Sequence, residues 1–230
     1  MEASKAGTSS TYGFRPMGFK PFILAALLLV AGLAFGAGRA SADPLRIVGF
    51  GDSLMAGYGL DTGQSFPEKL QKALATAGHD VVIENAGVSG DTTSGGLSRL
   101  DWSVPDGTDL VILELGANDM LRGIAPDLTR RNLDAMIARL KERGIAVLLV
   151  GMRAAPNLGI DYQSAFDAIY PELAKKYDLV LYPFFLDGVA AERSLLLEDG
   201  MHPNSAGIDV MVERFAPVIE PLLSADRHQP

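Results

Sequence analysis

Five short apolar runs, each ended by a glycine, a proline or a polar turn, constrain the fold of this chain more than any other feature. They are rich in leucine and β-branched residues and lie at residues 45–50, 80–85, 110–115, 145–150 and 179–182. Continuous apolar runs are typical of strands in a parallel sheet that helices cover on both faces. The sequence therefore predicts five parallel strands whose carboxyl ends meet at one edge of the sheet.

Helical patterns lie between these runs, at the spacing of a strand–helix–strand repeat. We expect helices near residues 65–77, 126–143, 162–177 and 205–223, with Pro171 kinking or dividing the third. Ser65 and Glu68 form a capping-box pattern at the start of the first helix. This alternation predicts an α/β fold, a single-domain three-layer α/β/α sandwich in which ligands bind at the carboxyl edge of the sheet.

Residues 1–42 differ from the remainder of the chain. They carry a net charge of +3 within a chain of net charge −8, and an apolar run at 22–38 is followed by Ala40-Ser41-Ala42. A basic flank, an apolar run and a small-x-small site in that order are typical of a secretory signal peptide. We therefore expect cleavage after Ala42 and a periplasmic or secreted domain at 43–230. An uncleaved anchor is the alternative, because the run reaches the lower limit for a spanning helix.

The composition excludes several kinds of chemistry. The chain has no cysteine, which excludes a disulfide framework, a thiolate metal site and a cysteine nucleophile. A three-histidine metal site would need His79, His202 and His228, the last of which is two residues from the C-terminus, so no metal or cofactor is expected. The negative charge argues against a nucleic-acid partner, because such partners select basic surfaces.

Ser53 is the first candidate for chemistry, because it lies where the first predicted strand passes into a helix. A side chain at such a point is exposed beside the free N–H groups of the helix start. The alternative is an ordinary helix N-cap, a position that serine favours. The sharp G-x-S-x-G elbow of the α/β-hydrolases is absent, because Met55 stands where that motif needs glycine.

His202 is the candidate general base by elimination, because His79 lies in a turn and His228 in a polar tail. Asp199 lies three residues before His202, where its carboxylate can accept a hydrogen bond from the imidazole and fix its tautomer. The alternative is that Asp199 and its neighbours only form the turn before the last helix.

Two further residues complete a possible anion site. Gly90 follows the second predicted strand and Asn118 the third, so both lie at the same edge as Ser53. The Gly90 N–H, the Asn118 amide and the Ser53 N–H together would form an oxyanion hole. Taken alone, each segment is also an ordinary loop. Asp52 and Asp91 are expected to cap a helix or to support the site residues, and neither is expected to take part in a catalytic step.

Together these segments resemble the SGNH hydrolase family, also called GDSL esterases and lipases. Its four blocks occur in order as Gly51-Asp52-Ser53-Leu54, Ser89-Gly90-Asp91-Thr92, Gly116-Ala117-Asn118-Asp119, and Asp199 with His202. The resemblance covers residues 45 to about 223. It implies that Ser53, His202 and Asp199 form a catalytic triad and that Ser53, Gly90 and Asn118 form the oxyanion hole.

Within the family, the chain is similar to the bacterial periplasmic group of multifunctional acyl-CoA thioesterases I and arylesterases. The segments 114–123, 168–174 and 182–185 carry this similarity. It implies a flavodoxin-like sheet in the order 2-1-3-4-5, a monomer, and a small acyl ester or thioester as substrate, with no stable membrane association after cleavage. In the group, the loop that corresponds to 152–159 borders the acyl site, but here its sequence does not reveal a chain-length preference.

Two other functions are open at this stage, and a third is excluded. A carbohydrate or cell-wall O-acetylesterase would use the same catalytic set, although sugar sites are usually polar and lined with aromatic residues, and Trp102 is the chain's one tryptophan. The apolar segment 156–158 favours an acyl chain instead. An inactive ligand-binding module of the same fold is the non-enzymatic alternative. A dinucleotide-binding module is excluded, because Leu54 occupies a glycine position of its fingerprint.

Overall fold

The computed structural model describes residues 1–2, 7–13 and 43–224. The apolar run and the cleavage site of the predicted signal peptide lie outside these residues, so both the signal peptide and the anchor alternative stay predictions. The chain divides into two compact units, Met1–Ala42 and Asp43–Pro230, and the helices and strands of the described residues lie in the second. Within the described ranges, no helix combines the length and the hydropathy that crossing a membrane requires.

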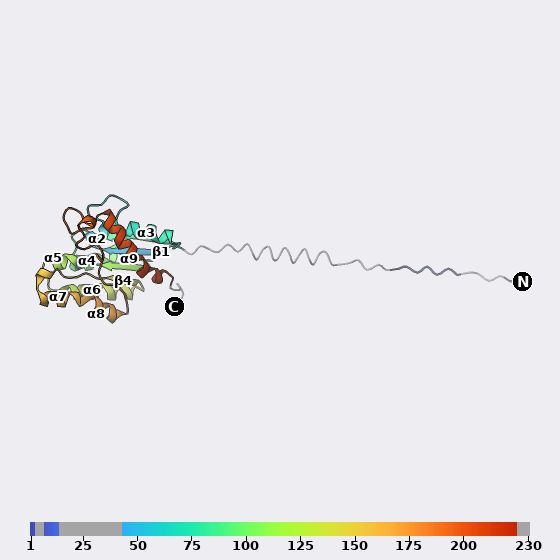
Figure 1. Ribbon diagram of the computed structural model, residues 1–230. Helices are drawn as coiled ribbons and strands as arrows, with labels where there is room; N and C mark the ends of the chain where they lie inside the picture. Colours follow the sequence, from blue (N-terminus) through green and yellow to red (C-terminus); the bar gives the residue numbers. More distant parts are fainter. Residues whose placement is uncertain (3–6, 14–42, 225–230) are drawn as a thin grey trace. The chain divides into compact units, whose positions relative to one another are not determined.

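Five parallel strands form one sheet at the centre of the second unit (Figure 1). Their order is β2-β1-β3-β4-β5, and every neighbouring pair is parallel. Their bounds are β1 Leu45–Gly51, β2 Val81–Gly87, β3 Leu110–Glu114, β4 Ala146–Val150 and β5 Val180–Tyr182. The predicted number, direction and order of the strands are confirmed, and their ends lie within two residues of the expected positions.

Helices cover both faces of the sheet, with α3 on one side and α6 and α8 on the other (Figure 1). The structure gives α2 Ser53–Ala56, α3 Phe66–Thr76, α4 Thr93–Ser103, α5 Ala117–Leu121, α6 Pro126–Glu142, α7 Ile160–Asp167, α8 Ile169–Tyr177 and α9 Ser205–Ser224, with short 3₁₀ turns η1 Pro156–Leu158 and η2 Arg193–Leu195. All four expected helices are present, and the capping box of α3 is formed, with the Ser65 Oγ 2.6 Å from Glu68 Oε2.

The third expected helix is divided, as expected for Pro171, and the break lies at Ala168 between α7 and α8. Pro171 has no N–H to bond to the carbonyl of Asp167 four residues earlier, so a continuous helix is interrupted there. Helix α4 was not expected, because Gly95 and Gly96 interrupt its apolar pattern. Gly96 is required there by packing: an added Cβ would lie 2.3 Å from the Leu115 side chain.

The core fixes the strand ends in place. Every residue of β3 is buried, and Phe66 packs edge-on against Phe185 and Phe215 with ring centroids 4.8 and 5.1 Å apart. Burying a side chain of this size contributes about 1.5–3 kcal/mol. Since the strands are parallel and rigidly packed, the segments that follow β1, β2 and β3 lie together at one edge of the sheet.

Candidate active site

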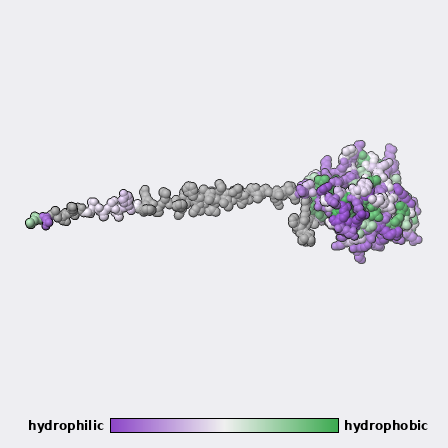
Figure 2. Space-filling view, turned by 180° about the vertical axis from the view of Figure 1, so that it is seen from behind, coloured by the Kyte–Doolittle hydropathy of each residue, from purple (hydrophilic) through white to green (hydrophobic). Residues whose placement is uncertain are grey.

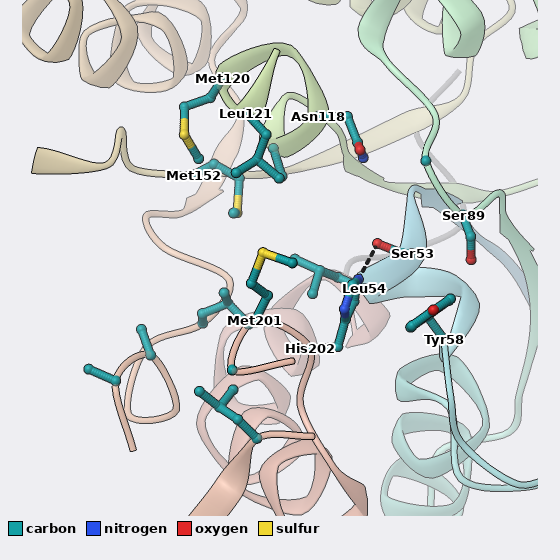
Figure 3. Close-up of a pocket in the computed structure, with 17 residues that line it drawn as sticks. Ser53, Leu54, Tyr58, Ser89, Asn118, Met120, Leu121, Met152, Met201 and His202 are labelled. Carbon is teal, nitrogen blue, oxygen red and sulfur yellow. Dashed lines mark hydrogen bonds between the residues drawn. The ribbon is translucent and has the colours of Figure 1, made fainter. Parts of the chain in front are cut away.

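Ser53 is the first residue of α2, directly after β1. The helix is capped by Asp52, whose Oδ1 accepts a hydrogen bond from the Leu54 N–H at 3.0 Å. The alternative interpretation of Ser53 as the N-cap is therefore wrong, because the preceding residue already fills that role. The Ser53 hydroxyl is instead within 2.9 Å of the His202 Nε2 (Figure 3).

His202 and Asp199 lie in the loop between η2 and α9. Asp199 Oδ2 is 2.6 Å from the His202 Nδ1, while Oδ1 accepts hydrogen bonds from the N–H groups of Met201 and His202 at 2.8 and 3.0 Å. These hydrogen bonds lower the pKa of Asp199 from 3.8 to about 2. The carboxylate is therefore ionised at any working pH and holds the imidazole with Nε2 toward Ser53.

The two expected oxyanion donors line the same cavity as Ser53. Gly90 has a φ of +81°, which favours glycine, and its carbonyl accepts a hydrogen bond from Arg122 Nη2 at 2.6 Å. Asn118, in α5, donates one amide hydrogen from Nδ2 to Asp52 Oδ2 at 3.0 Å. Because an amide group carries two hydrogens, the second is left for a ligand.

The cavity beside these groups is mostly apolar and has a volume of about 540 Å³, within the usual range for small-molecule sites. Met120, Met152 and Met201 lie on the other side of Ser53 from Ser89 (Figure 3). The apolar lining residues are Leu54, Ala117, Met120, Leu121, Met152, Leu186, Ala190, Ala191, Leu196 and Met201. Such a lining suits a hydrocarbon chain.

The lining comes from different segments than the sequence indicated. Of the loop 152–159, only Met152 lines the cavity, and Trp102 is exposed on the surface without lining it. Most of the apolar lining instead comes from α5 and from residues 186–201. The space-filling view shows hydrophobic and hydrophilic residues interspersed over the surface of this unit (Figure 2).

Tyr58 is a site residue that the sequence reasoning missed. Its ring lies 4.5 Å from the His202 ring, centroid to centroid, and it also lines the cavity (Figure 3). Nothing in the sequence points to this contact, because the two residues are far apart along the chain.

A buried carboxyl pair beneath Ser53 was missed as well. Asp52 and Glu114 are both fully buried, and the Asp52 N–H donates to Glu114 Oε2 at 3.2 Å. Burial raises the pKa of Asp52 to about 6 and that of Glu114 well above its usual range, and the charge of Asp52 raises that of Glu114 further. The available signal was Glu114 itself, the one charged residue in the apolar run 110–115.

Arg99 joins the ends of β1 and β2 below the site. Its guanidinium donates to the Gly51 carbonyl at 2.9 Å and the Ala86 carbonyl at 2.8 Å, and its Nε lies 2.7 Å from Asp91 Oδ2. Both partners of this ion pair are nearly buried. The expected supporting role of Asp91 agrees with this geometry, since the pair fixes the segment that carries Gly90.

Comparisons with known proteins agree with this architecture. Residues 50–210 match the model of the GDSL-like lipase/acylhydrolase family. Esterase TesA of Pseudomonas aeruginosa is 41% identical over 80% of this chain and 92% of its own length. Thioesterase 1/protease 1/lysophospholipase L1 of Escherichia coli is 36% identical over 81% of this chain and 88% of its own length.

A solved structure gives the same result. AlinE4, described as an SGNH-hydrolase family esterase, is 47% identical, covers 81% of this chain and all of its own, and superimposes with a TM-score of 0.68. The family match spans more than half of the chain, and the sheet has the strand order expected from the resemblance. This chain belongs to the GDSL-like lipase/acylhydrolase family, whose members include the SGNH ester hydrolases.

Proposed function

We propose that this chain is an exported serine hydrolase that cleaves short-to-medium acyl esters, with Ser53 as nucleophile, His202 as general acid and base, and Asp199 as the residue that orients His202. The proposal rests on one observation: the Ser53 Oγ, His202 and Asp199 form a continuous chain of contacts, 2.9 and 2.6 Å long, at an apolar cavity. The relatives' names, esterase and thioesterase, support the same reaction class.

The first half of the cycle acylates Ser53. The Ser53 Oγ attacks the carbonyl carbon while His202 Nε2 takes its proton, which leaves a tetrahedral intermediate with a negatively charged oxygen. The N–H groups of Ser53 and Gly90 and the free amide hydrogen of Asn118 stabilise this oxygen. The intermediate collapses when the bond to the leaving oxygen or sulfur breaks, and His202 returns its proton to that leaving group.

The second half releases the acid. A water molecule attacks the acyl-serine while His202 Nε2 accepts one of its protons, and the second tetrahedral intermediate uses the same three donors. His202 then protonates the Ser53 Oγ as the carboxylic acid leaves. Asp199 stabilises the imidazolium in both halves, because its carboxylate stays ionised throughout.

The cavity favours an acyl chain over a sugar. Its walls are mostly methyl, methylene and thioether groups. The tyrosine among the lining residues, Tyr58, packs against the His202 ring and does not offer a free aromatic surface for a sugar. Each methylene that the cavity buries contributes up to about 0.8 kcal/mol, or roughly a fourfold gain in kcat/KM. Activity should therefore rise along the acyl series from acetate until the cavity is filled.

Two measurements test the proposal. Purified protein is treated with a fluorophosphonate probe and is assayed on p-nitrophenyl esters of increasing chain length, on acyl-CoA and on acetylated sugars, with Ser53→Ala as the matched variant. We expect labelling at Ser53 and a drop in kcat of about 10⁵–10⁶-fold in the variant. An unlabelled, inactive wild-type protein would identify a binding module instead, and a preference for acetylated sugars would identify an O-acetylesterase.

Export is part of the proposal and has its own test. The basic flank, apolar run and Ala40-Ser41-Ala42 support secretion. Mass spectrometry of the protein from the periplasmic or extracellular fraction should give a chain that begins at Asp43. A full-length chain in the membrane fraction would support the anchor alternative.

A further inference from the structure

Two carboxyl groups lie beneath the oxyanion donors, and the proposed cycle uses neither of them. Asp52 Oδ1 accepts from the Leu54 N–H at 3.0 Å, and Asp52 Oδ2 accepts from the Asn118 amide at 3.0 Å. Asp52 therefore contacts both the start of α2, which carries Ser53, and the side chain proposed to bind the oxyanion. It is fully buried, so its own orientation depends on what surrounds it.

Glu114 is the group that lies behind Asp52. Its Oε2 accepts from the Asp52 N–H at 3.2 Å, and its Oε1 is buried with no hydrogen-bond partner in the described part of the chain. The chain leaves room for this carboxyl: a Cβ added at Gly51 would lie 2.4 Å from Oε2. A Cβ there would also lie 2.7 Å from the Glu114 carbonyl oxygen and from Met55 Cβ, so the glycine that opens the first family block allows the close approach of both Glu114 and Met55.

The contacts indicate which of the two carboxyls carries the charge. Asp52 accepts from two donors, whereas Glu114 accepts from one N–H and has one oxygen without a partner among the described residues. An anion is favoured where hydrogen-bond donors converge, and a buried carboxyl with fewer donors stays protonated. The charged groups that act on Asp52 are His202 and Asp91, and Asp52 acts on Glu114, while Tyr170 is a further titratable group near both carboxyls.

We propose that Glu114 is a positioning residue of the ester-hydrolysing site: as a neutral acid it holds Asp52, which in turn orients the Asn118 amide toward the oxyanion. The proposal rests on the function proposed above. Glu114 touches neither the substrate nor the reacting atoms. The proposal assigns its effect to the placement of the Asn118 amide in the transition state, so Glu114 acts on kcat rather than on KM.

The test compares two substitutions at this position. Glu114→Met keeps the length of the side chain but leaves the Asp52 N–H without its acceptor, whereas Glu114→Gln keeps an acceptor and stays neutral. We expect Glu114→Met to lower kcat on p-nitrophenyl butyrate by about 10–100-fold with KM within about twofold. We expect Glu114→Gln to restore most of that loss.

A double-mutant cycle with Asn118→Ala tests the route of the effect. Because Glu114 acts through Asn118, Glu114→Met should lower kcat by less than about threefold in a protein that already lacks the Asn118 amide. Ile112→Val, a buried change in the same strand, is the control for a general loss of packing and should leave kcat within about twofold of wild type.

Three results would overturn the proposal: a Glu114→Met protein with wild-type kcat, a loss that is fully additive with Asn118→Ala, or a Glu114→Gln protein as slow as Glu114→Met. If Glu114→Met does not fold, the pH profile of Glu114→Gln decides. A neutral Glu114 predicts an unchanged acid limb, and an ionised one predicts a limb moved to lower pH, because repulsion on Asp52 would be lost. An inactive wild-type protein would instead refute the function proposed above.

Discussion

The two aspartates of the site occupy opposite environments. Asp199 lies in the loop before α9 with its side chain 30% exposed, and its pKa is lowered to about 2. Asp52 lies at the end of β1 with no exposed surface, and its pKa is raised to about 6. Hydrogen bonds from its own turn stabilise the ionised form of Asp199, whereas burial disfavours the ionised form of Asp52 and donors from other elements offset part of that cost. The environment of Asp199 therefore needs only a local turn. The environment of Asp52 needs the ends of β1, β3 and two helices to lie together.

Replacing the exposed aspartate should have the larger effect on catalysis. Asp199→Asn removes the charge that stabilises the His202 imidazolium and allows the ring to adopt the wrong tautomer. We expect kcat on p-nitrophenyl butyrate to fall by about 10³–10⁴-fold, with the fold intact by circular dichroism. A loss under tenfold would mean that another group orients His202 and that the exposed carboxylate only shapes the turn.

The difference between the two regions explains how much the sequence could predict. Asp199 and His202 are three residues apart, so their pairing follows from spacing alone. The strands and the segments after them were also predictable, because apolar runs and glycine endings are local features. Asp52 and Glu114 are 62 residues apart, and their contact exists only because β1 and β3 are neighbours in the sheet.

The same reasoning accounts for the other differences. The sequence offers both Ser53 and Asp52 as caps of α2, and the structure selects Asp52 through a side-chain rotamer that composition does not determine. Helix α4 contains two adjacent glycines, so its packing against Leu115 outweighs its low propensity. The Tyr58 ring reaches His202 across a chain separation of more than a hundred residues. Each of these features depends on tertiary contacts.

The role of the buried aspartate, Asp52, can be tested through Asn118, the proposed oxyanion donor that it contacts. Asn118→Ala removes a donor that is fully engaged only in the transition state. We expect kcat to fall by about 10²–10³-fold with little change in KM. A change confined to KM would assign Asn118 to substrate binding in the ground state. It would also remove the catalytic reason for a buried Asp52 anion whose Oδ2 accepts from the Asn118 amide.

The smallest expected effect is on stability, and its sign differs between the two aspartates. Between pH 4 and 6 the folded protein holds the Asp52 proton more tightly than the unfolded chain, so its stability declines as pH rises through that window. Asp52→Asn removes this penalty, and we expect a Tm at pH 8 that is a few °C above that of wild type, with the gain vanishing near pH 4.

Asp199→Asn is the matched control for that measurement. The pKa of Asp199 is lowered, so its ionised form stabilises the fold at every pH above about 4, and that contribution is lost as pH falls toward 2. Its removal should therefore lower the Tm slightly at pH 8, the opposite sign to Asp52→Asn. If Asp52→Asn also lowers the Tm at pH 8, the hydrogen bonds to Leu54 and Asn118 outweigh the burial of the charge. Asp52 would then stabilise the fold as an anion, and the two aspartates would differ in exposure but not in their effect on stability.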